Sequence, residues 1–82
     1  MRYIVRVETK SDVLYLYVIN HNTPALTAKW EDATFFRTKE EAIHGFSLIR
    51  QNFSLQNCGI ISMEVRKIKV LFEDEIVAKE ML

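Results

Sequence analysis

The sequence predicts an α+β domain: a three-stranded antiparallel sheet with strand order 2-1-3, one main helix on one face and a short C-terminal helix. Three observations predict this fold. Two β-rich segments open the chain, a capped amphipathic segment follows them, and a third β-rich segment comes after it. The 82 residues are enough for one domain, so we treat residues 1–82 as a single ββαβ(α) unit.

The first two strands are predicted to form a hairpin. In residues 2–8, RYIVRVE, the odd positions are apolar and most even positions are charged, which is typical of a half-buried strand. Residues 13–20, VLYLYVIN, are mainly β-branched and aromatic, with apolar side chains on both faces. The polar residues 9–12, TKSD, supply a turn between them. The second strand therefore needs a cover on both faces, from the C-terminal helix or from a second copy of the chain.

The main helix is predicted over residues 39–51. Pro24 disfavours a central strand, so we expect residues 21–29 to form a loop before it. Thr38 and Glu41 have the spacing of a capping box, which satisfies free backbone N–H groups at a helix start. The helix carries one apolar stripe, made of Ala42, Phe46, Ile49 and Phe53. Gly45 is a poor helix former within this segment, and it would permit the helix to approach the sheet closely.

The third strand is predicted over residues 60–72. Its apolar residues change from odd to even positions across Arg66 and Lys67, which indicates a β-bulge there or a bend between two shorter strands. A right-handed passage over the sheet from the second strand to the third places the third strand beside the first. Residues 73–82, EDEIVAKEML, begin with acids and continue with apolar residues, which predicts the short C-terminal helix.

The composition favours a cytoplasmic location and does not favour a strongly charged partner. Eleven Lys and Arg residues balance eleven Asp and Glu residues, so the net charge attracts neither nucleic acid nor an anionic membrane. Cys58 is the single cysteine, which rules out an internal disulfide and favours a reducing compartment. The N-terminal residues lack a signal-peptide pattern, and the longest apolar run is too short to span a bilayer. We expect a cytoplasmic protein.

The residues that carry chemistry are sparse, and we expect no enzyme, no cofactor and no metal. His21, His44 and Cys58 are the only soft or borderline metal ligands, and no two of them share a ligand spacing. Cys58 has no basic neighbour in the sequence to activate its thiol. The acidic residues lie in adjacent pairs and runs, typical of a helix cap or a solvated face, and two separate glycines make no phosphate loop.

Two binding surfaces remain as hypotheses. A protein interface would use the doubly apolar second strand, the tryptophan and the apolar residues of the tail, since aromatic residues and Met are enriched at interface cores. Its residues would be Tyr15, Tyr17, Trp30, Ile76, Val77 and Met81. The alternative is a single-stranded nucleic-acid module using a basic strip on the sheet. That strip would comprise Arg2, Arg6, Arg66, Lys67 and Lys69. Acidic residues interrupt the strip, so the sequence favours the protein interface.

The segment W-E-D-A-T-F-F-R-T-K-E-E-A, residues 30–42, resembles small proteins encoded by bacteriophages and prophages of Gram-positive bacteria. The matching residues are Trp30, Asp32, Ala33, Phe36, Thr38, Lys39, Glu40, Glu41 and Ala42. The resemblance implies a phage origin and a stoichiometric role, in which the protein redirects a host protein or counters a defence system. It assigns no functional residue. We therefore expect a non-enzymatic protein of the interaction or inhibitor type, bound to a host or phage protein or to a second copy of itself.

Overall fold

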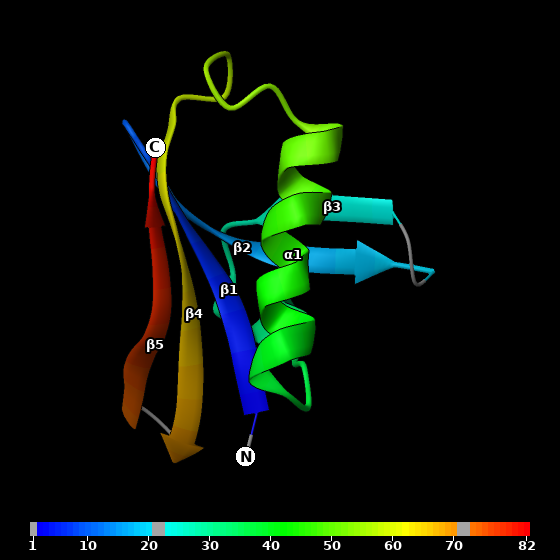
Figure 1. Cartoon of the computed structure of the whole chain (residues 1–82), viewed down its shortest axis with the longest axis vertical. Coiled ribbons are helices and arrows are strands. Elements are labelled where there is room, and N and C mark those ends of the chain that lie inside the picture. The colour runs from blue at the N-terminus through cyan, green and yellow to red at the C-terminus, as the bar shows by residue number, and fades with distance from the viewer. Residues whose placement is uncertain (1, 21–22, 71–72) are drawn as a thin grey trace.

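The chain forms a five-stranded antiparallel sheet with one α-helix packed across one face, as the computed structural model in Figure 1 shows. The structure describes residues 2–20, 23–70 and 73–82. The elements are β1 (Arg2–Thr9), β2 (Val13–Ile19), β3 (Thr23–Thr27), the 3₁₀ helix η1 (Trp30–Asp32), α1 (Lys39–Asn52), β4 (Ile60–Val70) and β5 (Glu73–Met81). The strand order is β3-β2-β1-β4-β5.

The predicted three-stranded sheet with a C-terminal helix is wrong, although its central pairings are confirmed. β1 pairs with β2 on one side and with β4 on the other, both antiparallel. The tail forms β5 against β4 and is not a helix. A helix of ten residues is marginal in water, whereas the free edge of β4 offers hydrogen-bond partners to every second residue of an extended tail. The tail thus extends the sheet and leaves the second face without a helix.

The predicted loop over residues 21–29 contains the edge strand β3, which tolerates Pro24 for a geometric reason. Pro24 is the partner of Val18 in the ladder between β2 and β3. The Val18 N–H donates instead to Thr34 Oγ1 at 2.8 Å, on the other side of β2. Because the Val18–Pro24 pair exchanges no ladder hydrogen bonds, the proline nitrogen points away from β2, where no N–H is needed.

The core lies between α1 and the sheet, and the helix begins as the sequence predicts. The Glu41 N–H donates to Thr38 Oγ1 at 3.1 Å, which caps the first turn. Ala42, Phe46 and Ile49 are buried on one stripe of the helix. They pack in one cluster with the apolar residues that the sheet turns toward the helix, namely Val5, Val7, Leu16, Ile60, Met63 and Val65.

The strand registers sort the other side chains onto the face that points away from α1, which we call the open face. It carries Ile4, Arg6, Tyr15, Tyr17, Glu64, Arg66, Ile76, Lys79 and Met81. The expected bulge or bend at Arg66 and Lys67 is wrong, because β4 keeps its register with β1 across these two residues. The irregularities lie in the pairing with β5: Val77 is the extra residue between the partners of Val65 and Arg66, and Lys69 is the extra residue between the partners of Asp74 and Glu73. The pairing with β1 thus determines which face of the sheet each β4 side chain points to.

Residues 33–36 occupy the space where β1 and β2 diverge. Tyr3 and Phe36 exchange two backbone hydrogen bonds, of 2.9 and 2.7 Å. On the other side, the Thr34 N–H donates to the carbonyl of Leu16 at 3.0 Å. The connection that includes η1 passes behind the sheet, on the side away from α1 (Figure 1). Ile4 is buried although it belongs to the open face, which agrees with this cover.

We expect Thr34→Val to destabilise the fold by about 1–3 kcal/mol, because it leaves the partly buried Val18 N–H without an acceptor. Valine matches threonine in shape, so packing changes little. Thr34→Ser keeps the hydroxyl and is the control, with a smaller loss expected. Urea denaturation of the three proteins measures the difference, and equal losses for Val and Ser would contradict this role of the hydroxyl.

We expect Gly45→Ala to lower the free energy of unfolding by about 1 kcal/mol. An added Cβ would lie 2.7 Å from Leu16 Cδ2 and 3.2 Å from Val5 Cγ2, and both of these side chains are fully buried. Overpacking costs about 1–3 kcal/mol, of which the better helix propensity of alanine returns about 1 kcal/mol. Gln51→Ala on the exposed side of α1 is the control and should not destabilise. Stabilisation by both substitutions would show that Gly45 has no packing role.

Candidate functional site

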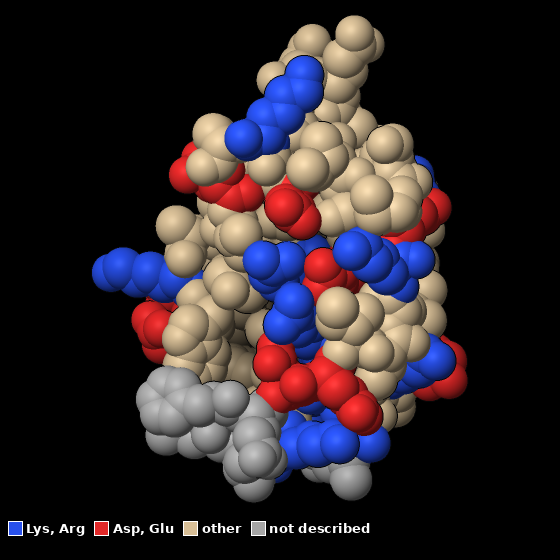
Figure 2. Space-filling model, turned by 90° about the vertical axis from the view of Figure 1, so that its left-hand side faces the viewer, with Lys and Arg blue, Asp and Glu red and all other residues tan. Residues whose placement is uncertain are grey.

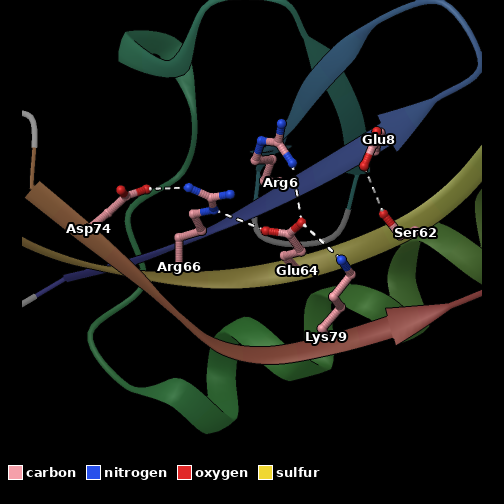
Figure 3. Close-up of polar contacts among 7 residues, drawn as sticks. All are labelled: Arg6, Glu8, Ser62, Glu64, Arg66, Asp74 and Lys79. Atoms are coloured by element: carbon pink, nitrogen blue, oxygen red, sulfur yellow. Dashed lines mark hydrogen bonds and ion pairs between the residues drawn. The ribbon is translucent and has the colours of Figure 1, made fainter.

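The middle of the open face holds a cluster of paired charges, which we call the Glu64 cluster: Arg6, Glu64, Arg66, Asp74 and Lys79 (Figure 3). Arg6 Nη1 donates to Glu64 Oε1 at 3.2 Å, and Arg66 Nε donates to Glu64 Oε2 at 3.0 Å. Arg66 Nη1 donates to Asp74 Oδ2 at 3.0 Å, and Lys79 Nζ lies 3.9 Å from Glu64 Oε1. Figure 2 shows the side of the molecule where Lys and Arg side chains alternate with Asp and Glu side chains.

Sheet geometry brings this cluster together. Glu64 lies on β4 directly opposite Arg6 of β1 and opposite Lys79 of β5, so opposite charges flank it on both neighbouring strands. Its side chain is only 3% exposed, and a buried carboxylate is tolerated when cations and hydrogen-bond donors surround it. Partial burial lowers the pKa of Arg66, but its hydrogen bonds to Asp74 and Glu64 outweigh this and raise that pKa above its usual value.

The arginines of the predicted nucleic-acid strip share the open face but are engaged within the chain. Arg6 and Arg66 both bind Glu64. The guanidinium carbon of Arg2 lies 5.8 Å from the ring centroid of Phe35, at cation–π distance. A phosphate would have to compete with the buried carboxylate for two of these three guanidinium groups.

The lysines of the strip are not continuous with its arginines. Lys67 is the partner of Tyr3 in the ladder between β1 and β4, which places it on the other face from Arg66. Lys69 Nζ lies 3.2 Å from Glu75 Oε2. The five residues thus form no continuous basic surface, and we do not propose nucleic-acid binding through them.

The residues of the predicted protein interface fall into two groups. Tyr17 is exposed on β2, where Tyr15 and Trp30 are half-buried and η1 contacts the strand. Ile76 and Met81 are 48% and 68% exposed on the open face of β5. The Glu64 cluster and two strands separate the two groups, so they do not form one patch.

Val77 does not belong with the exposed residues of β5. It is half-buried and packs against the core cluster, because the bulge turns it away from the open face. Leu82, the last apolar residue of the tail, is 50% exposed just after β5. Its N–H donates to the carbonyl of Ile61 at 3.0 Å, which holds the end of the tail along β4. A sequence pattern gives little warning of this, because a terminal Leu is equally compatible with a helix.

A second feature, which the sequence did not predict, is an open groove of about 790 Å³ between α1 and the end of β2. It is lined by Val18, Asn20, Thr34, Phe36, Glu40, Glu41, His44 and Leu48. No local pattern marks it, since its walls come from segments far apart in the sequence.

The described residues offer little for metal or thiol chemistry. Among them, no group of three or more His, Cys, Asp or Glu side chains lies close enough to hold a metal ion. His44 lies on α1 at the groove, Cys58 is exposed in the connection between α1 and β4, and His21 lies outside the described residues. Within the same part of the chain, no helix has the length and apolar character needed to cross a membrane.

We expect Glu64→Gln to destabilise the fold by about 2–3 kcal/mol. Loss of this buried charge leaves two guanidinium groups without their carboxylate, which costs about 3–5 kcal/mol when both partners are fully buried. The cost is lower here because Arg6 and Arg66 retain contact with water. Asp74→Asn, at the exposed end of the cluster, is the control and should cost less than about 1 kcal/mol. Equal losses in urea denaturation would contradict the central role of Glu64.

Comparisons with known proteins identify no family for this chain. No protein-family model matches it, and no curated protein or solved structure matches it. The resemblance of residues 30–42 to phage proteins stays a prediction, so the surfaces of the molecule are the basis for its proposed function.

Proposed function

We propose that this chain acts by binding another protein through the β5 side of the open face, without catalysing a reaction. The observation that carries the proposal is the exposure of large apolar side chains at one edge strand: Ile76 and Met81 lie on β5, and Leu82 follows directly after it. Single exposed apolar residues are ordinary on a protein surface, but several on one strand favour an interaction site.

The surroundings of these residues have the composition of an interface. Ile76 and Met81 lie on either side of Lys79 on the open face, and the Glu64 cluster borders them on the next strand. Apolar side chains with a polar, hydrogen-bonded border are common at protein interfaces. The charges of that border are already paired within the chain, so a partner can cover them without leaving a charge unpaired.

The same strand is protected against simple strand addition. The bulge at Val77 interrupts its regular edge, and charged side chains alternate with the apolar ones. Both features hinder edge-to-edge pairing with another sheet. Side chains of the open face therefore carry the proposed contact, and the backbone edge of β5 does not.

The proposed setting is the cytosol of a bacterial host, with a host or phage protein as partner. The resemblance of residues 30–42 to phage-encoded proteins supports the origin, and the single cysteine supports a reducing compartment. A stoichiometric binder needs no catalytic group, which agrees with the small number of His and Cys side chains in the chain.

We expect Ile76→Asp and Met81→Asp each to abolish capture of the partner from bacterial cytosol by the tagged chain. A carboxylate in place of either apolar side chain would lose its hydration when the partner covers it, which is costly. Ile43→Asp is the matched control, because Ile43 is 37% exposed but lies on α1. Quantitative mass spectrometry of the captured proteins measures the effect, and circular dichroism verifies that each variant folds.

Capture that survives both β5 substitutions, or is lost equally with Ile43→Asp, would overturn the proposed surface. Light scattering on the same samples decides whether the partner is a second copy. A self-associating wild-type chain that becomes monomeric with Ile76→Asp would identify the homodimer.

A further inference from the structure

The groove beside α1 is separate from the proposed protein interface. Val18 and Leu16 share the side of β2 that faces the helix, so the groove lies on the opposite side of the sheet from Ile76 and Met81. One wall is the first three turns of α1, and the other is the end of β2. Thr34 and Phe36 line the groove at the point where residues 34–36 bridge β1 and β2.

The floor of the groove is apolar and incompletely covered. Val18 and Phe36 pack against the core on one side and remain partly exposed on the other, and Leu48 adds a third half-buried apolar side chain. An apolar group placed over them would remove this surface from water. The Thr34 hydroxyl beside them already accepts the Val18 N–H, so the floor needs no polar ligand there.

The rim of the groove is acidic. Among the described residues that line it, the charged ones are Glu40 and Glu41, and no Lys or Arg belongs to the lining. Both carboxylates are exposed, and neither takes part in an ion pair within the described part of the chain. Their favourable effect on the helix dipole explains their place in the first turn. This effect does not use the carboxylates in an ion pair, so both can pair with a cation above the groove.

The shape favours a peptide over a small molecule. Sites for small molecules enclose most of the ligand surface, and this groove is open to solvent. An open channel with an apolar floor suits a segment of chain that places one side chain inward and its neighbours at the rim. Acidic side chains at that rim select basic neighbours.

We propose that this groove binds a peptide segment of a partner protein, with an apolar side chain over Val18, Phe36 and Leu48 and a basic side chain paired with Glu40 and Glu41. The site is independent of the β5 interface. A protein that uses both faces could hold two partners, or two parts of one partner.

Nuclear magnetic resonance titration of the full ¹⁵N-labelled chain tests the proposal. The probe is the blocked tetrapeptide Arg-Leu-Phe-Arg, and the matched control peptide is Glu-Leu-Phe-Glu. The basic peptide should shift the amide signals of Val18, Phe36, His44 and Leu48 in the millimolar range, and the acidic peptide should bind at least about tenfold more weakly. Equal shifts with both peptides, shifts confined to other residues, or no shift at all would overturn the proposal.

Charge removal at the rim adds a second test. The double variant E40Q/E41Q should bind the basic peptide about fivefold more weakly, since each exposed ion pair contributes modestly. Glu31→Gln in η1 removes an exposed charge that does not line the groove and should leave the affinity unchanged. An unchanged affinity of E40Q/E41Q would overturn the charge pairing.

The β5 variants separate this proposal from the proposed function. The chain carrying Ile76→Asp or Met81→Asp should bind the basic peptide as the unmodified chain does, because those residues lie on the other face. Loss of peptide binding in a folded β5 variant would show that the two surfaces are one site. Loss of partner capture without loss of peptide binding would leave the groove intact as a separate site.

Discussion

The divergence of β1 and β2 is the constraint on which the rest of this structure depends. Strands that separate leave backbone N–H and C=O groups without ladder partners, and buried groups of this kind must be satisfied. Residues 33–36 provide hydrogen-bond partners to both strands. Phe36 bonds to Tyr3 of β1, and Thr34 bonds to Leu16 and Val18 of β2. Their insertion determines where the connection passes between β1 and β2, and two of these residues, Thr34 and Phe36, line the groove beside α1.

The two faces of the sheet follow different physical rules. The face under α1 is closed by apolar packing, and Gly45 lets the helix approach closely enough for Leu16 to fit beneath it. The open face is held by paired charges around Glu64, contributed by β4 itself and by both neighbouring strands. Its exposed apolar side chains lie on β5 and β2, so the face is neither a second core nor a uniformly solvated surface.

Local sequence was sufficient for elements that are stabilised by their own residues. The Thr38 cap and the stripe of Ala42, Phe46 and Ile49 predicted α1 nearly to the residue, because capping and helical periodicity are local. The tail and residues 23–27 were mispredicted, since both become strands only through an edge offered by β4 or β2. The predicted interface was likewise divided: Ile76 and Met81 are exposed together, whereas the bulge turns Val77 inward.

The sequence by itself determined the helix, the opening hairpin and the balance of charges, because each depends on neighbours along the chain. Only the tertiary structure decided that Arg6 and Arg66 surround a buried Glu64 in place of a free basic strip. It also decided that a groove opens beside Phe36 and that apolar residues of the tail face solvent. Strand register is the physical reason, since a shift of one residue exchanges the faces of every side chain on a strand.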